Sequence, residues 1–372
     1  MPEIVLKNVT KKWGGFTAVE NLNLEIEDGA FITLLGPSGC GKTTTLRMIA
    51  GLETPTSGEI TIGGTVVFSS QKGINISAAK RDIGFLFQNY ALWPHMTVYQ
   101  NIAFGLETLK WKKPDIEKRV AQMLETLQIT QFAQRYPSEL SGGQQQRVAI
   151  ARTLAPSPKV LFMDEPLSNL DAKLRGEMRT ELKRLHADTG STFVYVTHDQ
   201  LEAMTMATKI CLMKEGVLQQ YDPPLTVYNH PSNRFVADFV GNPTMNFIPA
   251  KAVKLSDNTA RLEMLGEKFT FTSENSFMLK DGDISVGIRP EHLPISPKGS
   301  VPGQLTGTAY STLPAGMETT VKIKIGGTIL SSVMFGSLDY KVDSEICFTV
   351  QSDRILIFDV DGRCATSGTV TK

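Results

Sequence analysis

The residues best suited to chemistry lie in the segment GPSGCGKT, from Gly36 to Thr43, which matches G-x-x-x-x-G-K-[ST] at every fixed position. Glycines let a backbone wrap around a phosphate, and the N–H groups of such a loop and of the following helix point toward it. Lys42 adds positive charge for the β- and γ-phosphates, and the Thr43 hydroxyl is a ligand for Mg²⁺. An ordinary glycine-rich turn would need neither group, so we expect a nucleoside triphosphate site.

Two acidic residues, Asp164 and Glu165, end the apolar segment VLFMDE. A carboxylate at the end of a strand can hold Mg²⁺ through its water shell, which is the role expected of Asp164. Glu165 is the expected general base for an attacking water. Two acids that merely cap a strand are the alternative, but the phosphate-binding segment in the same chain favours the catalytic interpretation.

Three further side chains follow short apolar segments that are predicted strands. Gln88 ends IGFLFQ, where its amide can reach both Mg²⁺ and the water, and His198 ends FVYVTH, where it can donate to a γ-phosphate. Trp13 follows the first predicted strand and could stack on adenine. A lone histidine is usually structural and a lone aromatic residue is more often part of the core, so both alternatives stay open at this point.

A second anion-binding turn is predicted at LSGGQQQR, from Leu140 to Arg147, where a serine and two glycines open an expected helix. Backbone N–H groups at a helix start favour negative charge, but this turn has no lysine. A simple helix cap is the alternative. One chain with two such turns, of which only one has a lysine, raises the question of what the second turn binds.

The elements that must position these residues alternate between strands and helices. Short apolar strands are expected over 31–36, 83–88, 159–164 and 192–199. Helices are expected over 42–51 and 172–188, the first of them ending at Gly51. A hairpin is expected around Gly63 and Gly64. Alternation of this kind predicts an α/β fold with a parallel sheet. Alternating segments over 3–13 and 19–29 predict an antiparallel β subdomain, and the pattern turns helical between about 89 and 155.

The character of the chain changes after about residue 240. The segment GNPTMNFIP, 241–249, has the prolines of a linker, and short alternating runs follow at 283–290, 320–335 and 345–359. This pattern predicts an all-β barrel or sandwich. We therefore expect a nucleotide-binding domain over 1–240 and a β-rich regulatory domain over 241–372.

Composition excludes several functional classes. The 372 residues carry a formal net charge of zero, which gives no basic surface for nucleic acid. The four cysteines form no C-x-x-C pair, which is typical of a reduced compartment rather than of a disulfide framework or zinc site. No apolar run reaches the roughly 18 residues of a membrane span, so work at a membrane would require other chains.

The order of the motifs resembles the ATP-binding-cassette family, and most closely the ATPase subunits of maltose-type carbohydrate importers. The segments that carry the resemblance are GPSGCGKTTTLRMIAG, FQNYALWPHMTVYQNIAFGL, LSGGQQQRVAIAR, LFMDEPLSNLDAKLR and VYVTHDQLEAM. It covers the first 240 or so residues densely and returns at VGIRPEHL, 286–293. That last match is similar to the regulatory domain, of oligonucleotide-binding fold, found in such ATPases.

The resemblance implies a role for each matched residue. Trp13 occupies the position of an adenine-stacking aromatic residue, Gln88 that of the Q-loop glutamine, Glu165 that of the catalytic glutamate, and His198 that of the switch histidine. The implied catalytic residues are Glu165, His198, Gln88 and Lys42. The implied metal ligands are Thr43, Gln88 and Asp164. The implied nucleotide contacts are Trp13, Gly36, Ser38, Gly39, Cys40, Gly41, Lys42, Thr43, Thr44, Gln88, Arg135, Ser141, Gly142, Gly143, Gln144, Asp171 and His198.

The resemblance also answers what the second turn binds. In the family's arrangement two subunits pack head to tail, so Ser141 of one copy covers the γ-phosphate held by Lys42 of the other. The implied partners are a second copy or a closely related subunit, two transmembrane permease subunits and, indirectly, an extracytoplasmic solute-binding protein. The implied location is the cytoplasmic face of the cell membrane, and the implied cofactors are ATP and Mg²⁺. The loop 168–171 would lie between the two nucleotide sites.

Other functions remain as alternatives at this point. The solute could instead be glycerol phosphate, a polyamine or an anion, because the ATPase subunit does not touch it. A soluble cassette protein of DNA repair or translation is a further class, but no coiled-coil tract lies between GPSGCGKT and LSGGQ, and each motif occurs once. A purely regulatory binding module does not explain the complete set of catalytic motifs. Cys40, inside the loop at a helix start, is expected to have a lowered thiol pKa.

Overall fold

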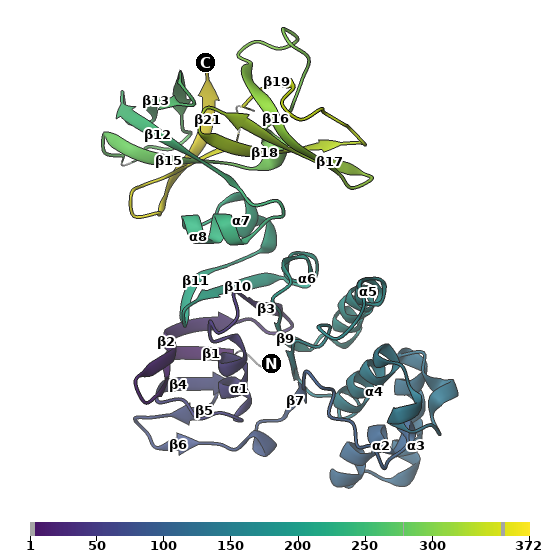
Figure 1. Cartoon of the computed structure of the whole chain (residues 1–372). Coiled ribbons are helices and arrows are strands. Elements are labelled where there is room, and N and C mark those ends of the chain that lie inside the picture. Colours follow the sequence, from purple (N-terminus) through teal and green to yellow (C-terminus); the bar gives the residue numbers. More distant parts are fainter. Residues whose placement is uncertain (1–3, 278, 351–353) are drawn as a thin grey trace. The chain divides into compact units, whose positions relative to one another are not determined.

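The computed structural model describes residues 4–277, 279–350 and 354–372 (Figure 1). Contacts divide the chain into two compact units, Met1–Pro224 and Leu225–Lys372. Each unit has its own hydrophobic core, as expected for a chain of this length. The strand predicted from residue 3 and the run predicted over 345–359 include positions 3 and 351–353, which lie outside the described residues.

Within the described residues, a sheet of six strands forms the centre of the first unit, and all but one edge strand run parallel. In spatial order the strands are β11 (Val217–Asp222), β10 (Lys209–Lys214), β3 (Phe31–Leu35), β9 (Thr192–Val196), β8 (Val160–Asp164) and β7 (Ile83–Leu86). Every residue of β3, β8 and β9 is buried, as expected where both faces of a parallel sheet are covered. Parallel strands end at one edge, so the residues that follow them meet there.

Helices α1 (Lys42–Ala50), α5 (Ala172–Thr189) and α6 (Gln200–Met206) accompany this sheet. Helix α1 ends at Gly51, whose φ of 78° is left-handed and whose N–H donates to carbonyl groups of the last turn. Helix α5 begins after Asp171, which caps it. The predicted parallel α/β core and the predicted helix end at Gly51 are confirmed.

An antiparallel sheet packs against the other side of α1, because the apolar residues of both sheets and of α1 form one buried cluster. Its strands, in spatial order, are β2 (Phe16–Ile26), β1 (Ile4–Trp13), β4 (Ser57–Ile62), β5 (Thr65–Ser69) and β6 (Ile74–Asn75), followed in the chain by the short turn η1 (Ala78–Lys80). The predicted hairpin is the β4–β5 pair, in which Ile62 lies opposite Thr65.

A helical region lies between β7 and β8 in the chain, within the residues 89–155 predicted for it. Its elements are α2 (Val98–Thr108), α3 (Lys113–Thr126), η2 (Thr130–Phe132), η3 (Pro137–Glu139) and α4 (Gly142–Leu154). Thr97 and Ser141 begin α2 and α4 with capping boxes, in which side chain and backbone hydrogen bonds are exchanged with the third helical residue. Helix α4 thereby presents the residues 141–144 at its start.

The second unit is rich in β-structure, as predicted (Figure 1). A closed barrel contains β12 (Asn246–Lys254), β13 (Thr259–Met264), β14 (Glu267–Thr272), β21 (Cys364–Thr371), β20 (Ile355–Phe358) and β15 (Gly282–Ile288). A second sheet contains β18 (Thr328–Phe335), β17 (Glu318–Ile325), β16 (Leu305–Pro314) and β19 (Glu345–Phe348), and η4 (Pro290–His292) follows β15.

Two short helices, α7 (Pro224–Asn229) and α8 (Arg234–Phe239), precede the barrel. The buried guanidinium of Arg289 donates to the carbonyl oxygens of Tyr228 (2.8 Å) and Ala237 (3.1 Å) and lies over the Tyr228 ring. These contacts group the helices with the barrel, so the contact boundary falls at 224/225, earlier than the predicted boundary at 240/241. A local sequence pattern gives no sign of so distant a contact.

Candidate nucleotide site

Residues 36–43 span the loop between β3 and α1 together with the first two residues of α1, and this segment is called the loop 36–43. Gly36 and Gly41 have φ angles of 149° and 97°, a conformation that favours glycine. A Cβ atom on Gly36 would clash with the carbonyl oxygen of Met213, and one on Gly41 with that of Ala18. The glycines therefore let the loop lie tight against the neighbouring backbone and curve back on itself.

Lys42 lies at the start of α1 and is only 5% exposed. Its Nζ donates hydrogen bonds to the carbonyl oxygens of Gly36 (2.7 Å) and Pro37 (2.9 Å), which hold the ammonium group within the curve of the loop. Ser38 and Gly39, at the tip of the loop, are exposed. A cation beside the N–H groups of an open glycine loop and a helix start is the donor set that phosphate oxygens require, so the loop fits a nucleotide.

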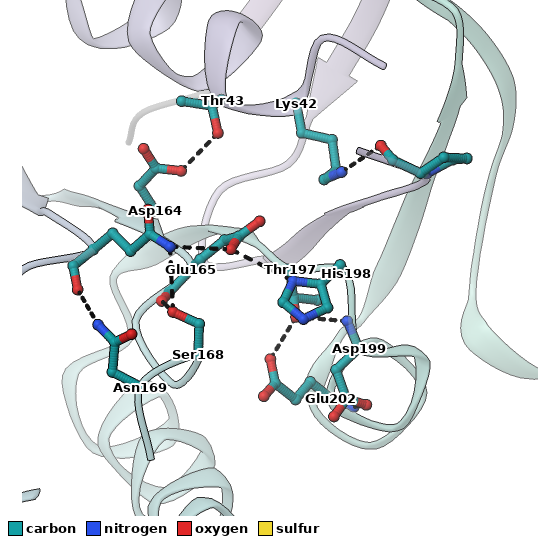
Figure 2. Close-up of polar contacts among 12 residues, drawn as sticks. Lys42, Thr43, Asp164, Glu165, Ser168, Asn169, Thr197, His198, Asp199 and Glu202 are labelled. Atoms are coloured by element: carbon teal, nitrogen blue, oxygen red, sulfur yellow. Dashed lines mark hydrogen bonds and ion pairs between the residues drawn. The ribbon is translucent and has the colours of Figure 1, made fainter. Parts of the chain in front are cut away.

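Thr43 and Asp164 meet although they belong to α1 and β8 (Figure 2). The Thr43 hydroxyl donates a 2.8 Å hydrogen bond to Oδ1 of Asp164. Asp164 is 4% exposed, and its Oδ2 lies 3.4 Å from Nη2 of Arg47, a contact that the sequence did not predict. A hydroxyl and a carboxylate suit Mg²⁺, which keeps several waters when it binds, so this pair fits the predicted metal site.

Glu165 follows Asp164, and its backbone N–H donates to the carbonyl oxygen of Val196 at 3.1 Å, which ties the end of β8 to β9. Its φ of 46° is left-handed, a strained conformation that is more common at functional sites. Its Oε2 lies 3.4 Å from Nδ1 of His198, as Figure 2 shows, and 3.4 Å from Nε2 of Gln88. The structure therefore brings together the three residues that sequence analysis took from three different strand ends.

The loop after β8 is held against this cluster. The Ser168 hydroxyl donates to the carbonyl oxygen of Glu165 at 2.8 Å, and the Asn169 amide donates to the carbonyl oxygen of Gln88 at 3.2 Å. Asp171, at the end of the loop, caps α5 and is exposed. The loop therefore connects the residues around Glu165 to the start of α5.

Trp13 and Arg135 lie apart from this cluster in sequence and in their contacts. Trp13 is 46% exposed and its ring stacks on that of Phe16 at an interplanar angle of 6°, which argues against a role in the core. Arg135 is exposed, with its guanidinium 5.5 Å from the centroid of the Phe132 ring. Within the described residues neither side chain forms a hydrogen bond with residues 36–43, so their nucleotide contacts stay predictions.

The second turn caps its own helix. The Ser141 hydroxyl accepts from the Gln144 N–H at 3.4 Å, and the Gln144 side chain accepts from the Ser141 N–H at 2.9 Å. Ser141 and Gly142 are exposed, whereas Gly143 is buried against α5. Figure 1 shows α4 well separated from α1, and no hydrogen bond of the described residues joins 141–144 to 36–43. The capped helix start is thus open to an anion from outside its own chain.

The structure corrects the expectation of a lowered thiol pKa for Cys40. Burial raises the pKa of the Cys40 thiol, and the positive charge of Lys42 opposes this only in part. The predicted low pKa is therefore wrong in direction, because the argument from a helix start neglects the cost of placing a thiolate in a site that is 3% exposed. The Sγ atom lies 3.8 Å from Nζ of Lys42, so Cys40 does belong to the loop.

Sequence analysis did not single out three residues next to His198 that are hydrogen-bonded to one another in Figure 2, namely Thr197, Asp199 and Glu202. The Thr197 hydroxyl donates to the buried Glu202 carboxylate at 2.6 Å and accepts from the Asp199 N–H at 2.9 Å. A hydroxyl directly after an apolar strand and a carboxylate in the first turn of the following helix are the signals that could have revealed them.

Two family profiles match the chain: the family described as ABC transporter over residues 19–168, and the MalK OB fold domain over residues 241–293. The trehalose/maltose import ATP-binding protein MalK of Thermococcus litoralis is 44% identical over 366 residues, 96% of this chain and 98% of the relative. The chain belongs to the ABC transporter ATP-binding family. The resemblance inferred from the motifs is therefore confirmed, as are the fold class, the ATPase activity and the cofactors, ATP and Mg²⁺.

Other relatives agree. The maltose/maltodextrin import ATP-binding protein MalK of Salmonella typhimurium is 45% identical over 87% of this chain and 86% of the relative. The osmoprotective compounds uptake ATP-binding protein GgtA of Synechocystis is 42% identical over 96% and 98%. Among solved structures, a dimeric ATP-binding cassette in a post-hydrolysis state with ADP and Pi is 36% identical, has a TM-score of 0.52, and covers 59% of this chain and 98% of its own.

Proposed function

We propose that this chain is the ATP-hydrolysing subunit of an importer that takes up a carbohydrate through partner membrane subunits. The observation that carries the proposal is the 44% identity to a trehalose/maltose import ATP-binding protein along 96% of this chain and 98% of the relative. The relatives named above are import or uptake proteins, which favours transport over DNA repair or translation.

The nucleotide is held by residues at one edge of the parallel sheet. Lys42 and the N–H groups of the loop 36–43 bind the β- and γ-phosphates, and Trp13 stacks on the adenine. Thr43, Asp164 and Gln88 hold Mg²⁺ directly or through water. When bound, Mg²⁺ neutralises the negative charge that develops on the phosphate oxygens.

Glu165 removes the proton from the attacking water with its carboxylate. Nε2 of Gln88 and Nδ1 of His198, each 3.4 Å from Oε2, keep that carboxylate at the edge of the sheet. The His198 side chain is 58% exposed, which leaves its ring accessible for a hydrogen bond to the γ-phosphate. Hydrolysis thus requires residues that follow β7, β8 and β9 at the same time.

The complete site forms between two copies of the chain, or between one copy and a closely related subunit. The loop 36–43 and the exposed start of α4 lie apart within one chain, and a similar cassette has been solved as a dimer bound to ADP and Pi. Ser141 and the N–H groups of Gly142 and Gly143 of one copy cover the phosphate that Lys42 of the other copy holds. ATP therefore stabilises the closed dimer, and hydrolysis releases it.

The helical region is the surface proposed to dock on two permease subunits, which in turn receive solute from an extracytoplasmic binding protein. In the part of the chain that the structure describes, no helix is long and apolar enough to span a membrane. Phe87, Phe104 and Trp111 expose 37–38% of their surface, and the Trp93 ring packs on Phe104 with centroids 4.4 Å apart. Phe87 directly precedes Gln88, so a docked partner would sense the state of the site. The proposed location is the cytoplasmic face of the cell membrane.

The solute is tested with the assembled transporter. The chain is copurified with its membrane subunits and solute-binding protein, and ATP hydrolysis is measured with maltose, trehalose, glycerol phosphate, spermidine or sulfate. We expect a carbohydrate to stimulate hydrolysis and the other solutes to leave it at the basal rate. Stimulation by one of the other solutes alone would contradict carbohydrate import, and a complete lack of hydrolysis would contradict the ATPase assignment itself.

A further inference from the structure

A buried carboxylate lies beneath the loop that carries His198. Glu202, in the first turns of α6, is 3% exposed. Its Oε2 accepts hydrogen bonds from the hydroxyl of Tyr195 at 2.8 Å and from the hydroxyl of Thr197 at 2.6 Å. Both donors lie just before His198, so a single carboxylate oxygen is tied to the end of β9 at two points.

Thr197 passes this constraint to both sides of the histidine. Its hydroxyl donates to Glu202 and accepts from the Asp199 N–H at 2.9 Å, as Figure 2 shows, while its own N–H donates to the carbonyl oxygen of Leu34 at 3.2 Å. The two residues that flank His198, Thr197 and Asp199, are therefore both held. The histidine side chain itself is 58% exposed, so its place is set mainly by this backbone.

Asp199 extends the connection to another functional loop. Its Oδ1 caps α6 by accepting from the N–H groups of Leu201 (2.8 Å) and Glu202 (3.3 Å), and its Oδ2 lies 3.4 Å from Nη1 of Arg175. Nη2 of Arg175 donates to the carbonyl oxygen of Leu170 at 3.0 Å. The segment after His198 is thus linked to the loop that ends at Asp171.

Filling space does not explain a carboxylate at this position. Burial raises the pKa of Glu202; the two hydroxyl donors and the charge of Arg175 lower it, and the charge of Asp199 raises it further. An apolar side chain of similar size would fill the same volume without the desolvation cost of a charge. The cost occurs four residues after His198, a side chain whose position affects the chemistry of the site.

We propose that Glu202 is a positioning residue for His198: it holds Thr197 on one side of the histidine and, through the Thr197 hydroxyl, the Asp199 N–H on the other side, so that the imidazole stays beside Glu165. The proposal rests on the proposed function in one respect, the role of His198 in hydrolysis. Glu202 itself touches neither Glu165 nor the loop 36–43 through any hydrogen bond of the described residues.

Two substitutions separate positioning from the filling of space. In Glu202→Gln the amide oxygen can still accept from both hydroxyl groups, so most of kcat should be retained. In Glu202→Leu no acceptor remains, and we expect kcat of the assembled transporter to fall by about 10- to 100-fold with KM for ATP unchanged, because small misplacements of a catalytic group have effects of this size. Rescue by glutamine distinguishes the hydrogen bonds from the charge.

Thr192 provides a matched control at the opposite end of the same strand. Like Thr197 it is buried and accepts from a backbone N–H, in this case that of Gly29 at 2.9 Å. The changes Thr197→Val and Thr192→Val each remove one buried hydroxyl, and Thr197→Val should lower Tm more, because it also removes a donor to the buried Glu202 carboxylate. Only Thr197→Val should lower kcat.

NMR spectroscopy of the isolated chain reports the surroundings of the His198 ring directly. The sequence has five histidines, so histidine-labelled protein gives few ring resonances, and the His198 resonance is assigned by its loss in His198→Gln. We expect this resonance to shift in Glu202→Leu and Thr197→Val and to stay in place in Thr192→Val. Thr197→Val is the milder change and carries the test if Glu202→Leu does not fold.

The outcomes are distinguishable. Equal losses of kcat in the two threonine variants, or a His198 resonance unmoved in Glu202→Leu and Thr197→Val, would overturn the positioning role. Full kcat in His198→Ala would instead overturn the role of His198 in the proposed function, while the resonance would still report whether Glu202 fixes the ring. A loss of kcat in Glu202→Leu, its recovery in Glu202→Gln, and a His198 resonance that shifts in Glu202→Leu and Thr197→Val but not in Thr192→Val support the proposal.

Discussion

Nδ1 of His198 lies 3.4 Å from Oε2 of Glu165, and the two residues follow the adjacent parallel strands β9 and β8. Adjacent parallel strands require a crossover, here α5, so residues that meet at the end of the sheet are far apart in the chain. The hydrogen bond from Thr43 to Asp164 has the same origin, since it joins the helix after β3 to the end of β8. The site is a property of the sheet edge rather than of any one segment.

Glu165→Gln should separate nucleotide binding from hydrolysis. The amide keeps the size of the side chain but cannot accept the proton of water, so we expect kcat to fall by about 10²- to 10⁴-fold while ATP binding persists. Closed dimers with trapped ATP should accumulate and are measured as bound nucleotide per dimer. Glu177→Gln, an exposed acid on α5, is the control. Turnover of Glu165→Gln near the wild-type rate would mean that another group is the base.

The thiols of Cys40, Cys211 and Cys364 should react slowly at neutral pH. Burial raises the pKa of Cys40, and it raises that of Cys211 to about 12 and that of Cys364 to about 11. A raised pKa keeps a thiol protonated, so alkylation of Cys40 by iodoacetamide should still accelerate as pH passes the ordinary value of 9.0, and MgATP should slow it. Peptide mass spectrometry gives the rate, with Cys40→Ser as control. A rate that levels off near neutral pH would contradict the effect of burial.

Sequence alone predicted those parts of the site whose chemistry is contained in one short segment. The loop 36–43 is recognisable because its glycines, Lys42 and Thr43 have fixed spacing, and Gln88 and His198 stand out as polar residues that end apolar strands. The fold class follows for the same reason, since alternating strands and helices specify a parallel sheet.

Contacts between distant segments could not be predicted in this way. The ion pair of Arg47 with Asp164 and the hydrogen bonds of Arg289 to α7 and α8 depend on how elements pack. Desolvation raises the pKa of Cys40, opposite to the predicted direction. The local sequence does not show that this thiol is buried, so the shift could not be predicted from it. For Glu202 the spacing from His198 was visible, but only the fold shows that its carboxylate points to Thr197.

Truncation should test the boundary between the two units. Val227, Val236 and Ala237, from α7 and α8, are fully buried, and Ala237 packs with residues of the barrel. A fragment 1–224 should bind ATP as a monodisperse protein, whereas 1–241 should bind ATP but self-associate, because it exposes those apolar faces. ATP binding and size-exclusion chromatography are the measurements. Loss of ATP binding in a folded fragment 1–224 would place part of the site outside the first unit.

A mixed dimer tests whether the start of α4 completes the site of the partner copy. Lys42→Ala removes the cation that holds the phosphates in its own loop. Ser141→Arg leaves that loop intact but places a bulky cation at the exposed helix start, where a phosphate of the partner must fit. Each change alone, present in both copies, should prevent trapping of ATP at both sites.

The decisive dimer carries Lys42→Ala in one copy and Ser141→Arg in the other. If Ser141 acts across the interface, both changes fall in the same composite site, and the second site keeps its own Lys42 and its partner's Ser141. If Ser141 acts within its own chain, each site has one change and neither is intact. We therefore expect about one trapped ATP per mixed dimer with the membrane subunits present, against two in the wild type, as the head-to-tail arrangement of two composite sites requires. A mixed dimer that traps none, beside a wild type that traps ATP, would refute that arrangement.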